Sequence, residues 1–255
     1  AAASMTYDSG NTDKLSVFKQ DCLAHDIAVM PPCVNASEAR FTVEHHNEKP
    51  AVRYALGAIR NVGVDAMHHL VQERNANGAF SSIDNVISRM SGALSRRFLE
   101  NLIKAGAFDE LEPNRARLMA GLDVMVGHGQ AIKRERESNQ VSLFGGDAAD
   151  DMKLVLPNVP EQASKLRLED EFAALGLYIS AHPMDDYADQ LAAKDIIRAA
   201  DIEADVKKKG LPSTRINLAG IVTGKQIRTS ARGNRFAFIQ MTDQSGSFEV
   251  TLFSD

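Results

Sequence analysis

The sequence of 255 residues contains no tryptophan and only two cysteines, Cys22 and Cys33, which match no CxxC pattern. We expect both thiols to be free, although one disulfide between them stays an open alternative. No apolar run approaches the roughly 18–20 residues that span a bilayer, and residues 1–7 lack the basic and apolar regions of a signal peptide. These absences favour a cytoplasmic chain with no membrane partner.

Clusters of metal-binding or catalytic residues are also missing from the sequence. The histidine pairs at 45–46 and 68–69 have no cysteine or third ligand at metal-site spacing. The aspartates within residues 147–151 lie in a polar, irregular stretch, whereas two-metal phosphoryl transfer needs carboxylates on a rigid scaffold. We therefore expect neither a catalytic site nor a cofactor in this chain.

Negative charge is absent from one long stretch, although the whole chain has a formal net charge of −5. The residues from 207 to 235 include no Asp or Glu and carry Lys207, Lys208, Lys209, Arg215, Lys225, Arg228, Arg232 and Arg235. A phosphate backbone needs such a local positive field, whatever the charge of the whole chain. The composition, 44% hydrophobic and 25% charged, is otherwise that of a soluble globular protein with one large domain or two to three small ones.

The first half of the chain has the apolar spacing of short helices. This spacing predicts a helix over 13–28, capped by Asn11, Thr12 or Asp13, followed by a strand over 39–44 and a polar turn over 46–50. From 51 to 136 helices alternate with Gly, Asn and Ser. Three of them are expected to start at Ser81-Ser82, at Ser95 and at Glu112-Pro113-Asn114.

The second half changes character twice. Residues 137–160 have no helical period and predict a loop, and helices are expected over about 161–175 and 184–194. Alternating apolar residues then predict strands over 216–222, 235–241 and 247–253, with a hairpin turn at 243–246. The fold class is therefore mainly α with a C-terminal partial antiparallel sheet. Three strands leave open edges, so we expect the natural chain to continue beyond Asp255.

The loop contains a distinctive peptide, Gln140-Val141-Ser142-Leu143-Phe144. Two adjacent large apolar residues in a polar loop are costly unless they are buried against something. A Leu-Phe anchor with a Gln three residues before the Leu suits a linear peptide that docks into an apolar pocket. The alternative, in which Leu143 and Phe144 pin the loop to this protein's own surface, remains open on the pattern alone.

The turn at Asn61-Val62-Gly63 resembles a helix-hairpin-helix motif, with Asn61 in place of the first glycine. Asn tolerates the left-handed conformation, and backbone amides at a helix N-terminus can face a phosphate. A degenerate second copy surrounds Gly106, although both turns could be simple αα-hairpins with glycine caps. The candidate contacts to duplex DNA are Arg60, Asn61, Gly63, Arg96, Arg97, Lys104 and Gly106.

The last 45 residues resemble the start of an OB-fold, in which a basic face with aromatic residues can follow a single strand. The candidates for single-strand contact are Lys225, Arg228, Arg232 and Arg235. Phe236 and Phe238 alternate with Ala237 and should point to one face, where we interpret them as core residues.

Together these segments resemble the alpha subunits of bacterial DNA polymerase III. The resemblance covers essentially the whole chain and rests on MTYDSGNTDKL, GAIRNVGVDAM, RRFLENLIKAGAFDEL, QVSLF, GLYISAHPMDDY and the RGNR, TDQSG and VTLFSD segments. It implies the end of a fingers domain (1–46), a tandem helix-hairpin-helix DNA-binding domain (47–136), a clamp-binding loop (137–160), a helical connector (161–210) and a truncated OB-fold (211–255). The family's palm domain, with its Mg²⁺ site, would lie upstream.

The resemblance also implies partners and a role. The QxxLF pattern is similar to the peptide with which bacterial replication proteins bind the sliding clamp, the beta subunit, so the expected partners are DNA, the clamp and other replicase subunits. The implied role is to hold the polymerase on DNA rather than to catalyse synthesis. Two alternatives remain at this stage: a nuclease or repair enzyme with the same hairpin domain, and a protein-interaction scaffold that never touches DNA.

Overall fold

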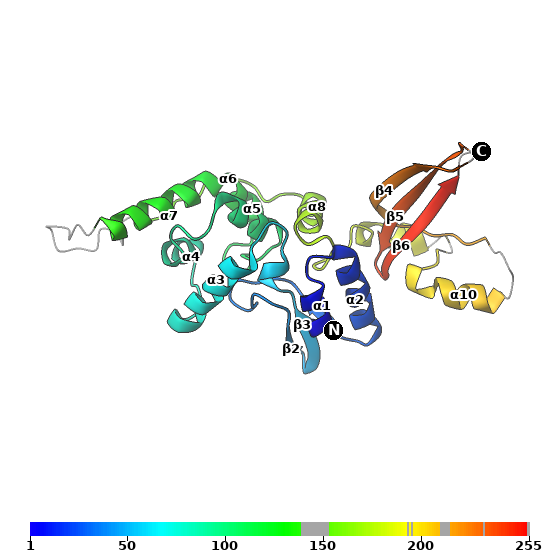
Figure 1. Ribbon diagram of the computed structural model, residues 1–255, viewed down its shortest axis with the longest axis horizontal. Helices are drawn as coiled ribbons and strands as arrows, with labels where there is room; N and C mark the ends of the chain where they lie inside the picture. Colours follow the sequence, from blue (N-terminus) through cyan, green and yellow to red (C-terminus); the bar gives the residue numbers. More distant parts are fainter. Residues whose placement is uncertain (139–152, 193, 195, 210–214, 232, 254–255) are drawn as a thin grey trace.

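The computed structural model describes residues 1–138, 153–192, 194, 196–209, 215–231 and 233–253. Figure 1 shows an elongated molecule, in which a helical body lies between the projecting end of α7 and a separate C-terminal sheet. The helices are α1 (Ala2–Tyr7), α2 (Thr12–Ala24), α3 (Val64–Asn77), α4 (Ile83–Arg89), α5 (Arg96–Lys104), α6 (Arg115–Ala120), α7 (Leu122–Glu137), α8 (Ser164–Leu175), α9 (Ala188–Ala192) and α10 (Ile202–Lys209). Short 3₁₀ turns are η1 (Leu56–Ala58), η2 (Asp185–Tyr187) and η3 (Ala199–Asp201). The strands are β1 (Ala28–Met30), β2 (Thr42–His46), β3 (Lys49–Arg53), β4 (Ile221–Thr229), β5 (Arg235–Asp243) and β6 (Gly246–Phe253).

The N-terminal sheet has the order β1-β3-β2, with β1 parallel and β2 antiparallel to β3. The polar turn expected over 46–50 is shorter than predicted, because only Asn47 and Glu48 form it. Both have positive φ values, 50° and 64°, and this is the geometry of a tight two-residue hairpin. The prediction for Lys49 and Pro50 was therefore wrong, since both belong to β3.

The predicted helix caps are confirmed at four helices. Each capping oxygen accepts a backbone N–H at 3.1–3.3 Å, and the capping residues are Asn11, Ser82, Ser95 and Asn114. The first helix was predicted to end four residues too late, at 28 instead of Ala24, because the chain turns at Asp26 (φ 57°) before entering β1.

The buried Arg74 of α3 fastens that helix to the segment that follows β1. Its guanidinium donates to the carbonyl oxygens of Val34 (3.1 Å) and Ser37 (2.7 Å) and pairs with Glu38 at 2.7 Å. One hydrophobic core runs through this region and includes Tyr54, Leu70 and Leu102, all fully buried. The N-terminal sheet and the helices from α3 to α7 therefore share a single core.

Helix α8 is attached to the helical body by a buried ionic network. Arg115, which is 4% exposed, donates to both carboxylate oxygens of Asp109 at 2.8 and 2.7 Å and to the Lys104 carbonyl at 2.9 Å. Arg167 of α8 reaches the same carboxylate at 2.8 Å. The fully buried Glu171 of α8 accepts the Ile179 and Ser180 amides at 2.6 and 3.0 Å and so fixes the turn that follows the helix.

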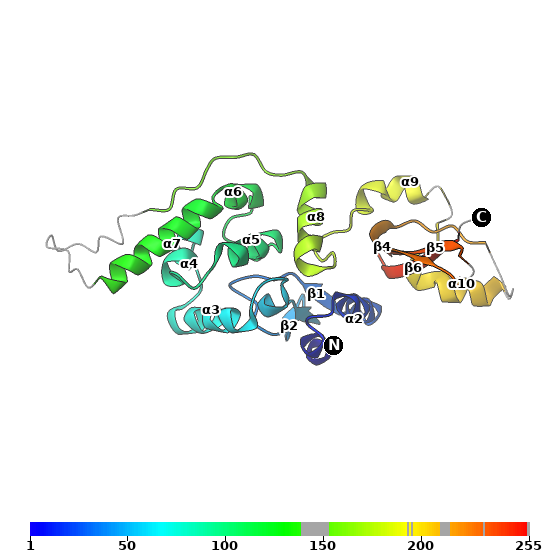
Figure 2. The ribbon, with the colours of Figure 1, turned by 45° about the horizontal axis from the view of Figure 1, so that its top comes forward.

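The described segment before α8, residues 153–163, runs back over the helical body, as Figure 2 shows. Leu154 and Leu156 pack against the core, and the Asn114 side chain donates to the Val159 carbonyl at 2.9 Å. This segment therefore lies across the start of α6.

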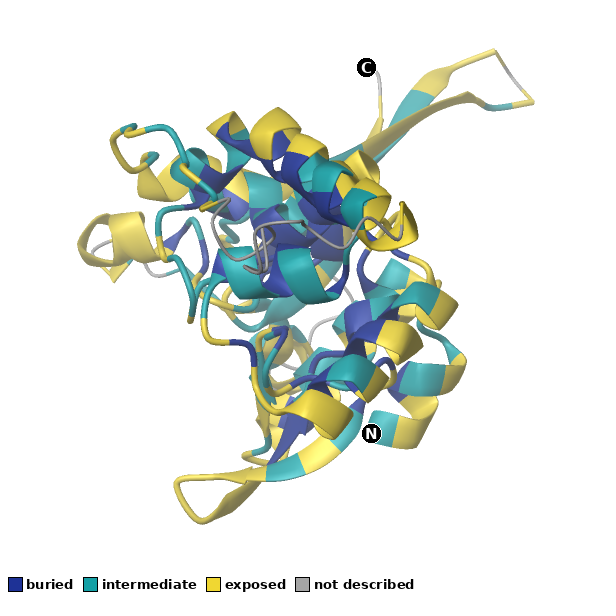
Figure 3. Cartoon of the chain, turned by 90° about the vertical axis from the view of Figure 1, so that its left-hand side faces the viewer, coloured by how far each residue is buried: buried dark blue, intermediate teal, exposed yellow. Residues whose placement is uncertain are grey.

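The C-terminal sheet is an antiparallel meander in the order β4-β5-β6. The turn predicted at 243–246 is confirmed, because Asp243 accepts the Ser245 and Gly246 amides at 2.8 and 2.9 Å. The first strand lies later than predicted, at Ile221–Thr229 rather than 216–222. Figure 3 shows the sheet exposed or partly exposed over most of its length, and the described core takes no residue from it. The three described strands form no closed barrel, so the OB-fold and the division into domains stay predictions.

Gly106 provides a test of the ionic network. It has a φ of +78°, and a Cβ atom there would lie 2.1 Å from Nη2 of Arg115; Gly78 has a φ of +83° with nothing within 4 Å. Gly78→Ala should lower the free energy of unfolding by about 1 kcal/mol through backbone strain alone. Gly106→Ala should cost about 3 kcal/mol or more, because it also displaces a buried, paired guanidinium. Urea unfolding of the two variants checks this, and equal losses would contradict it.

Candidate functional site

The turn at residues 60–63 leads into α3 and leaves the start of that helix open. Asn61 has a φ of +61°, as its place in the motif requires, and Val62 is buried beneath the turn. Gly63 caps the helix with an extended backbone and provides no side-chain acceptor. Because the first amides of a helix have no partner within it, the exposed residues 63–65 present N–H groups and the positive end of the helix dipole to solvent.

Arg97 places a positive charge beside this helix end. It lies in the first turn of α5, is exposed, and its guanidinium donates to the side-chain oxygen of Asn61. The ring of Phe98 lies 3.8 Å from the Cβ position of Gly63, so α5 packs directly against the turn. The structure therefore brings together three predicted residues, Asn61, Gly63 and Arg97.

Arg96 and Lys104 are engaged elsewhere on α5. Arg96 donates to Asp123 at 2.9 Å, and this hydrogen bond and charge raise the pKa of Arg96. Lys104 pairs with Glu100 at 2.7 Å, which lowers the pKa of that carboxyl. Both charges are partly neutralised by their neighbours.

Arg60 faces away from the open turn. Its guanidinium donates to the Ala173 carbonyl at 3.2 Å and to the Thr12 hydroxyl at 3.4 Å, and its backbone N–H donates to the Ala174 carbonyl at 2.9 Å. A cation at the last carbonyls of a helix is favourable. In this structure, Arg60 caps the C-terminal end of α8.

The second hairpin is closed. Gly106 is buried, and its N–H donates to the Ile103 carbonyl at 2.9 Å. The next helix, α6, is capped by Asn114, which is itself tied to Val159. Of the two predicted turns, only the first has an uncapped helix N-terminus facing solvent.

The basic residues of the C-terminal sheet fall on different faces. In the β4–β5 register Arg228 pairs with Phe236, and its guanidinium lies 5.8 Å from the ring centroid of Phe238. Lys225 pairs with Ile239 and lies three residues before Arg228 on β4, so it points to the other face. Arg235 alternates with Phe236 and shares that other face, whereas Arg232 lies outside the described residues.

Phe236 and Phe238 do share one face, as predicted. Their ring centroids lie 5.4 Å apart in an edge-on arrangement, and Phe253 stacks beside Phe236 at 6.2 Å. All three stay partly exposed or exposed, so the described part of the sheet does not bury them as a core.

The peptide from Gln140 to Phe144 lies outside the described residues, between the end of α7 and Lys153. The described chain has no group of three or more His, Cys, Asp or Glu residues that could hold a metal ion. Within the same residues, no helix has the length and apolar character needed to cross a membrane.

Sequence reasoning missed one set of polar residues. Lys19 of α2 and His182 lie far apart in the chain, yet both line a cleft between the helical body and the C-terminal sheet. His182 lies in the GLYISAHP segment, whose pattern indicates a turn but gives no sign of what the histidine faces.

Comparison with known sequences agrees with the hairpin geometry. Residues 26–118 match the family model of a helix-hairpin-helix motif. The DNA polymerase III subunit alpha of Caulobacter vibrioides is 38% identical over 251 residues, covering 98% of this chain and 21% of that protein. The subunits of Neisseria meningitidis serogroup A (34% over 254 residues, 98% of this chain and 21% of that protein) and of Vibrio cholerae (32% over 257 residues, 100% and 22%) match along the same length.

The chain thus spans about a fifth of the length of these relatives. The matches extend over nearly the whole chain and so include both hairpins and the C-terminal sheet. By sequence, the chain belongs to the family of DNA polymerase III alpha subunits, as a segment that carries a helix-hairpin-helix motif.

Proposed function

We propose that this segment binds duplex DNA through its phosphate backbone and tethers a replicative DNA polymerase to its sliding clamp. The proposal rests above all on the open N-terminus of α3 beside Arg97, in a segment that matches a helix-hairpin-helix motif. Backbone amides, a helix dipole and one guanidinium together suit a phosphate oxygen. None of these groups reads a base edge, so the binding is independent of sequence.

The role in synthesis is one of positioning. DNA-directed DNA synthesis in chromosome replication would take place elsewhere in the subunit, with Mg²⁺ at its palm domain, while this segment holds the product duplex. Residues 140–144 would bind an apolar pocket of the clamp, with Leu143 and Phe144 as anchors and Gln140 at the rim. Contacts with further replicase subunits belong to the same proposal.

Arg97 is the side chain on which DNA affinity should depend most. Arg97→Gln should weaken binding to duplexes of any sequence and should reduce the slope of log affinity against log salt by about one. Arg117→Gln removes the same charge at the covered second hairpin, where Arg117 pairs with Glu112 at 3.0 Å, and should leave the slope unchanged. Fluorescence anisotropy with two unrelated duplexes between about 50 and 200 mM salt measures both. Equal effects of the two substitutions would argue against the α3 site, and no binding by the parent chain would favour a scaffold without DNA contact.

Asp65 should act in the opposite direction. It is exposed in the first turn of α3 and opposes a phosphate at that helix end, so Asp65→Asn should raise DNA affinity about threefold. Asp13 occupies the same place on α2 and serves as the matched control. Asp13→Asn removes the same single negative charge, but at a helix that does not belong to the hairpin. Tighter binding by both variants alike would indicate a general charge effect and not a site at α3.

The clamp contact is tested separately. The chain should bind the cognate sliding clamp in the micromolar range, about −8 kcal/mol, and the Leu143→Ala, Phe144→Ala double variant should lose this binding. Val155 is 74% exposed further along the same connection, and Val155→Ala should bind like the parent chain in calorimetry. If the double variant binds as well as the parent, Leu143 and Phe144 are not the clamp anchors.

A further inference from the structure

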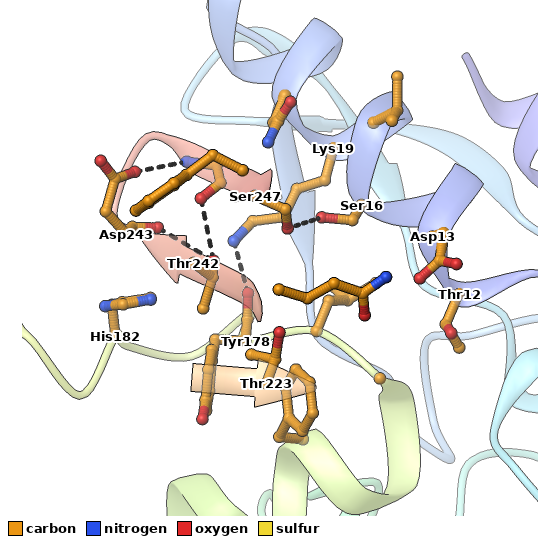
Figure 4. Close-up of a pocket in the computed structure, with 18 of the residues that line it drawn as sticks. Thr12, Asp13, Ser16, Lys19, Tyr178, His182, Thr223, Thr242, Asp243 and Ser247 are labelled. Atoms are coloured by element: carbon orange, nitrogen blue, oxygen red, sulfur yellow. Dashed lines mark hydrogen bonds between the residues drawn. The ribbon is translucent and has the colours of Figure 1, made fainter. Parts of the chain in front are cut away.

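A cavity of about 570 Å³ lies between the helical body and the C-terminal sheet. Figure 4 shows its walls: α2 on one side, the turn after α8 on another, and the strands β4 to β6 on the third. Ser16 of α2 and Ser247 of β6 close one edge through a hydroxyl–hydroxyl hydrogen bond of 2.8 Å. The volume falls within the range of small-molecule sites.

Lys19 carries a positive charge into this cavity. Its ammonium donates to the Tyr178 carbonyl at 2.5 Å, and within the described part of the chain the other two of its three N–H donors have no partner. Burial lowers the pKa of Lys19. No carboxylate within the described ranges lies at ion-pair distance from it, and the nearby Glu171 is held by two backbone amides. Lys19 is thus a desolvated cation whose charge lacks a counterion at contact distance.

His182 lines the same cavity and has a ring nitrogen that no hydrogen bond of the described residues uses. The residue is only 8% exposed, and its Nδ1 accepts the Met184 amide at 3.2 Å, which places the proton of the neutral ring on Nε2. Nε2 is buried and has no hydrogen-bond partner among the residues that the structure describes. Burial lowers the pKa of His182, so the ring is neutral at pH 7 and Nε2–H is a donor.

The remaining lining fits an anion joined to a flat group. The space is lined by Thr223 and Thr242 and by the rings of Phe172 and Phe248, which provide apolar walls. The Thr242 hydroxyl donates to the Gly246 carbonyl at 3.1 Å. The buried acid, Asp243, is already satisfied, because its two oxygens accept from the Ser245 amide and hydroxyl and from the Gly246 and Ala199 amides. Asp13 and Glu249 also line the cavity but are exposed to solvent, which weakens their effect on an anion inside.

We propose that this cavity binds a phosphate-containing ligand the size of a nucleotide or larger. The Lys19 ammonium and Nε2–H of His182 hold its phosphate group. The phosphate supplies the counterion that Lys19 lacks and the acceptor that His182 lacks, and an attached nucleoside rests against the aromatic walls. This site is distinct from the α3 turn and does not depend on it. The phosphate comes either from a free nucleotide or from a single strand that passes between the helical body and the sheet.

The test follows His182 directly by NMR in the whole 255-residue chain. The imidazole Nε2 resonance should shift saturably on addition of dTMP or pyrophosphate at constant ionic strength, and chloride should have no such effect. Because this measurement needs no substitution, it does not depend on any variant being folded. Absence of a saturable shift with dTMP, pyrophosphate and an oligothymidylate, each up to about 10 mM, would overturn the proposal.

Substitutions then assign the two donors. Lys19→Gln and His182→Gln should each weaken binding of dTMP at least about tenfold, because each removes a charge-assisted or buried hydrogen bond to the phosphate. Lys14→Gln, on the same helix but paired with Asp8 at 2.7 Å on the surface, should leave it unchanged. Equal weakening by Lys14→Gln and Lys19→Gln would mean general charge attraction and would reject the site.

Competition with the oligothymidylate identifies the source of the phosphate. Displacement of dTMP by the oligonucleotide supports a strand as the natural ligand, and failure to displace it supports a free nucleotide. Arg97→Gln should not affect either result. Failure of phosphate binding in the cavity and failure of DNA binding at the α3 site are therefore distinguishable.

Discussion

The bidentate pair of Arg115 and Asp109 fixes the arrangement of the helical body. A guanidinium this deeply buried is tolerable only because its donors are met by the carboxylate and by the Lys104 carbonyl. The same carboxylate binds Arg167, so the second hairpin and α8 share one acceptor. The same packing requires glycine at position 106, because any side chain there would occupy the position of the guanidinium.

Docking of α8 gives the two hairpins different surroundings. The second hairpin holds α8 and is covered by the returning segment around Val159, so it has no free helix end. The side chain of Arg60 caps the C-terminal end of α8, so its charge lies away from the N-terminus of α3. What remains open is the start of α3 with Arg97 beside it. Two similar turns in sequence thus have different surroundings in the fold.

Local chemistry made much of this fold predictable. Ser82, Ser95 and Asn114 cap their helices as the sequence indicates, because a cap depends on atoms three residues away. β1 was missed because it is defined by its pairing with β3, more than 20 residues further along the chain, and β3 because the turn before it is only two residues long. The site was predictable at Asn61 but not at Arg60, whose acceptor lies 113 residues further along the chain. Charge and position in a turn do not reveal such a partner.

The acidity of the whole chain is compatible with a phosphate-binding surface. Several acids near the hairpins already have cationic partners, as Asp123 has Arg96 and Glu100 has Lys104. Screening over about 8–10 Å limits the effect of the remaining acids on Arg97. The described end of α7 and the C-terminal sheet lie at opposite ends of the molecule (Figure 1). Under the proposed function, a clamp contact through residues 140–144 and a DNA contact at α3 each raise the effective concentration of the other, so that neither has to be tight.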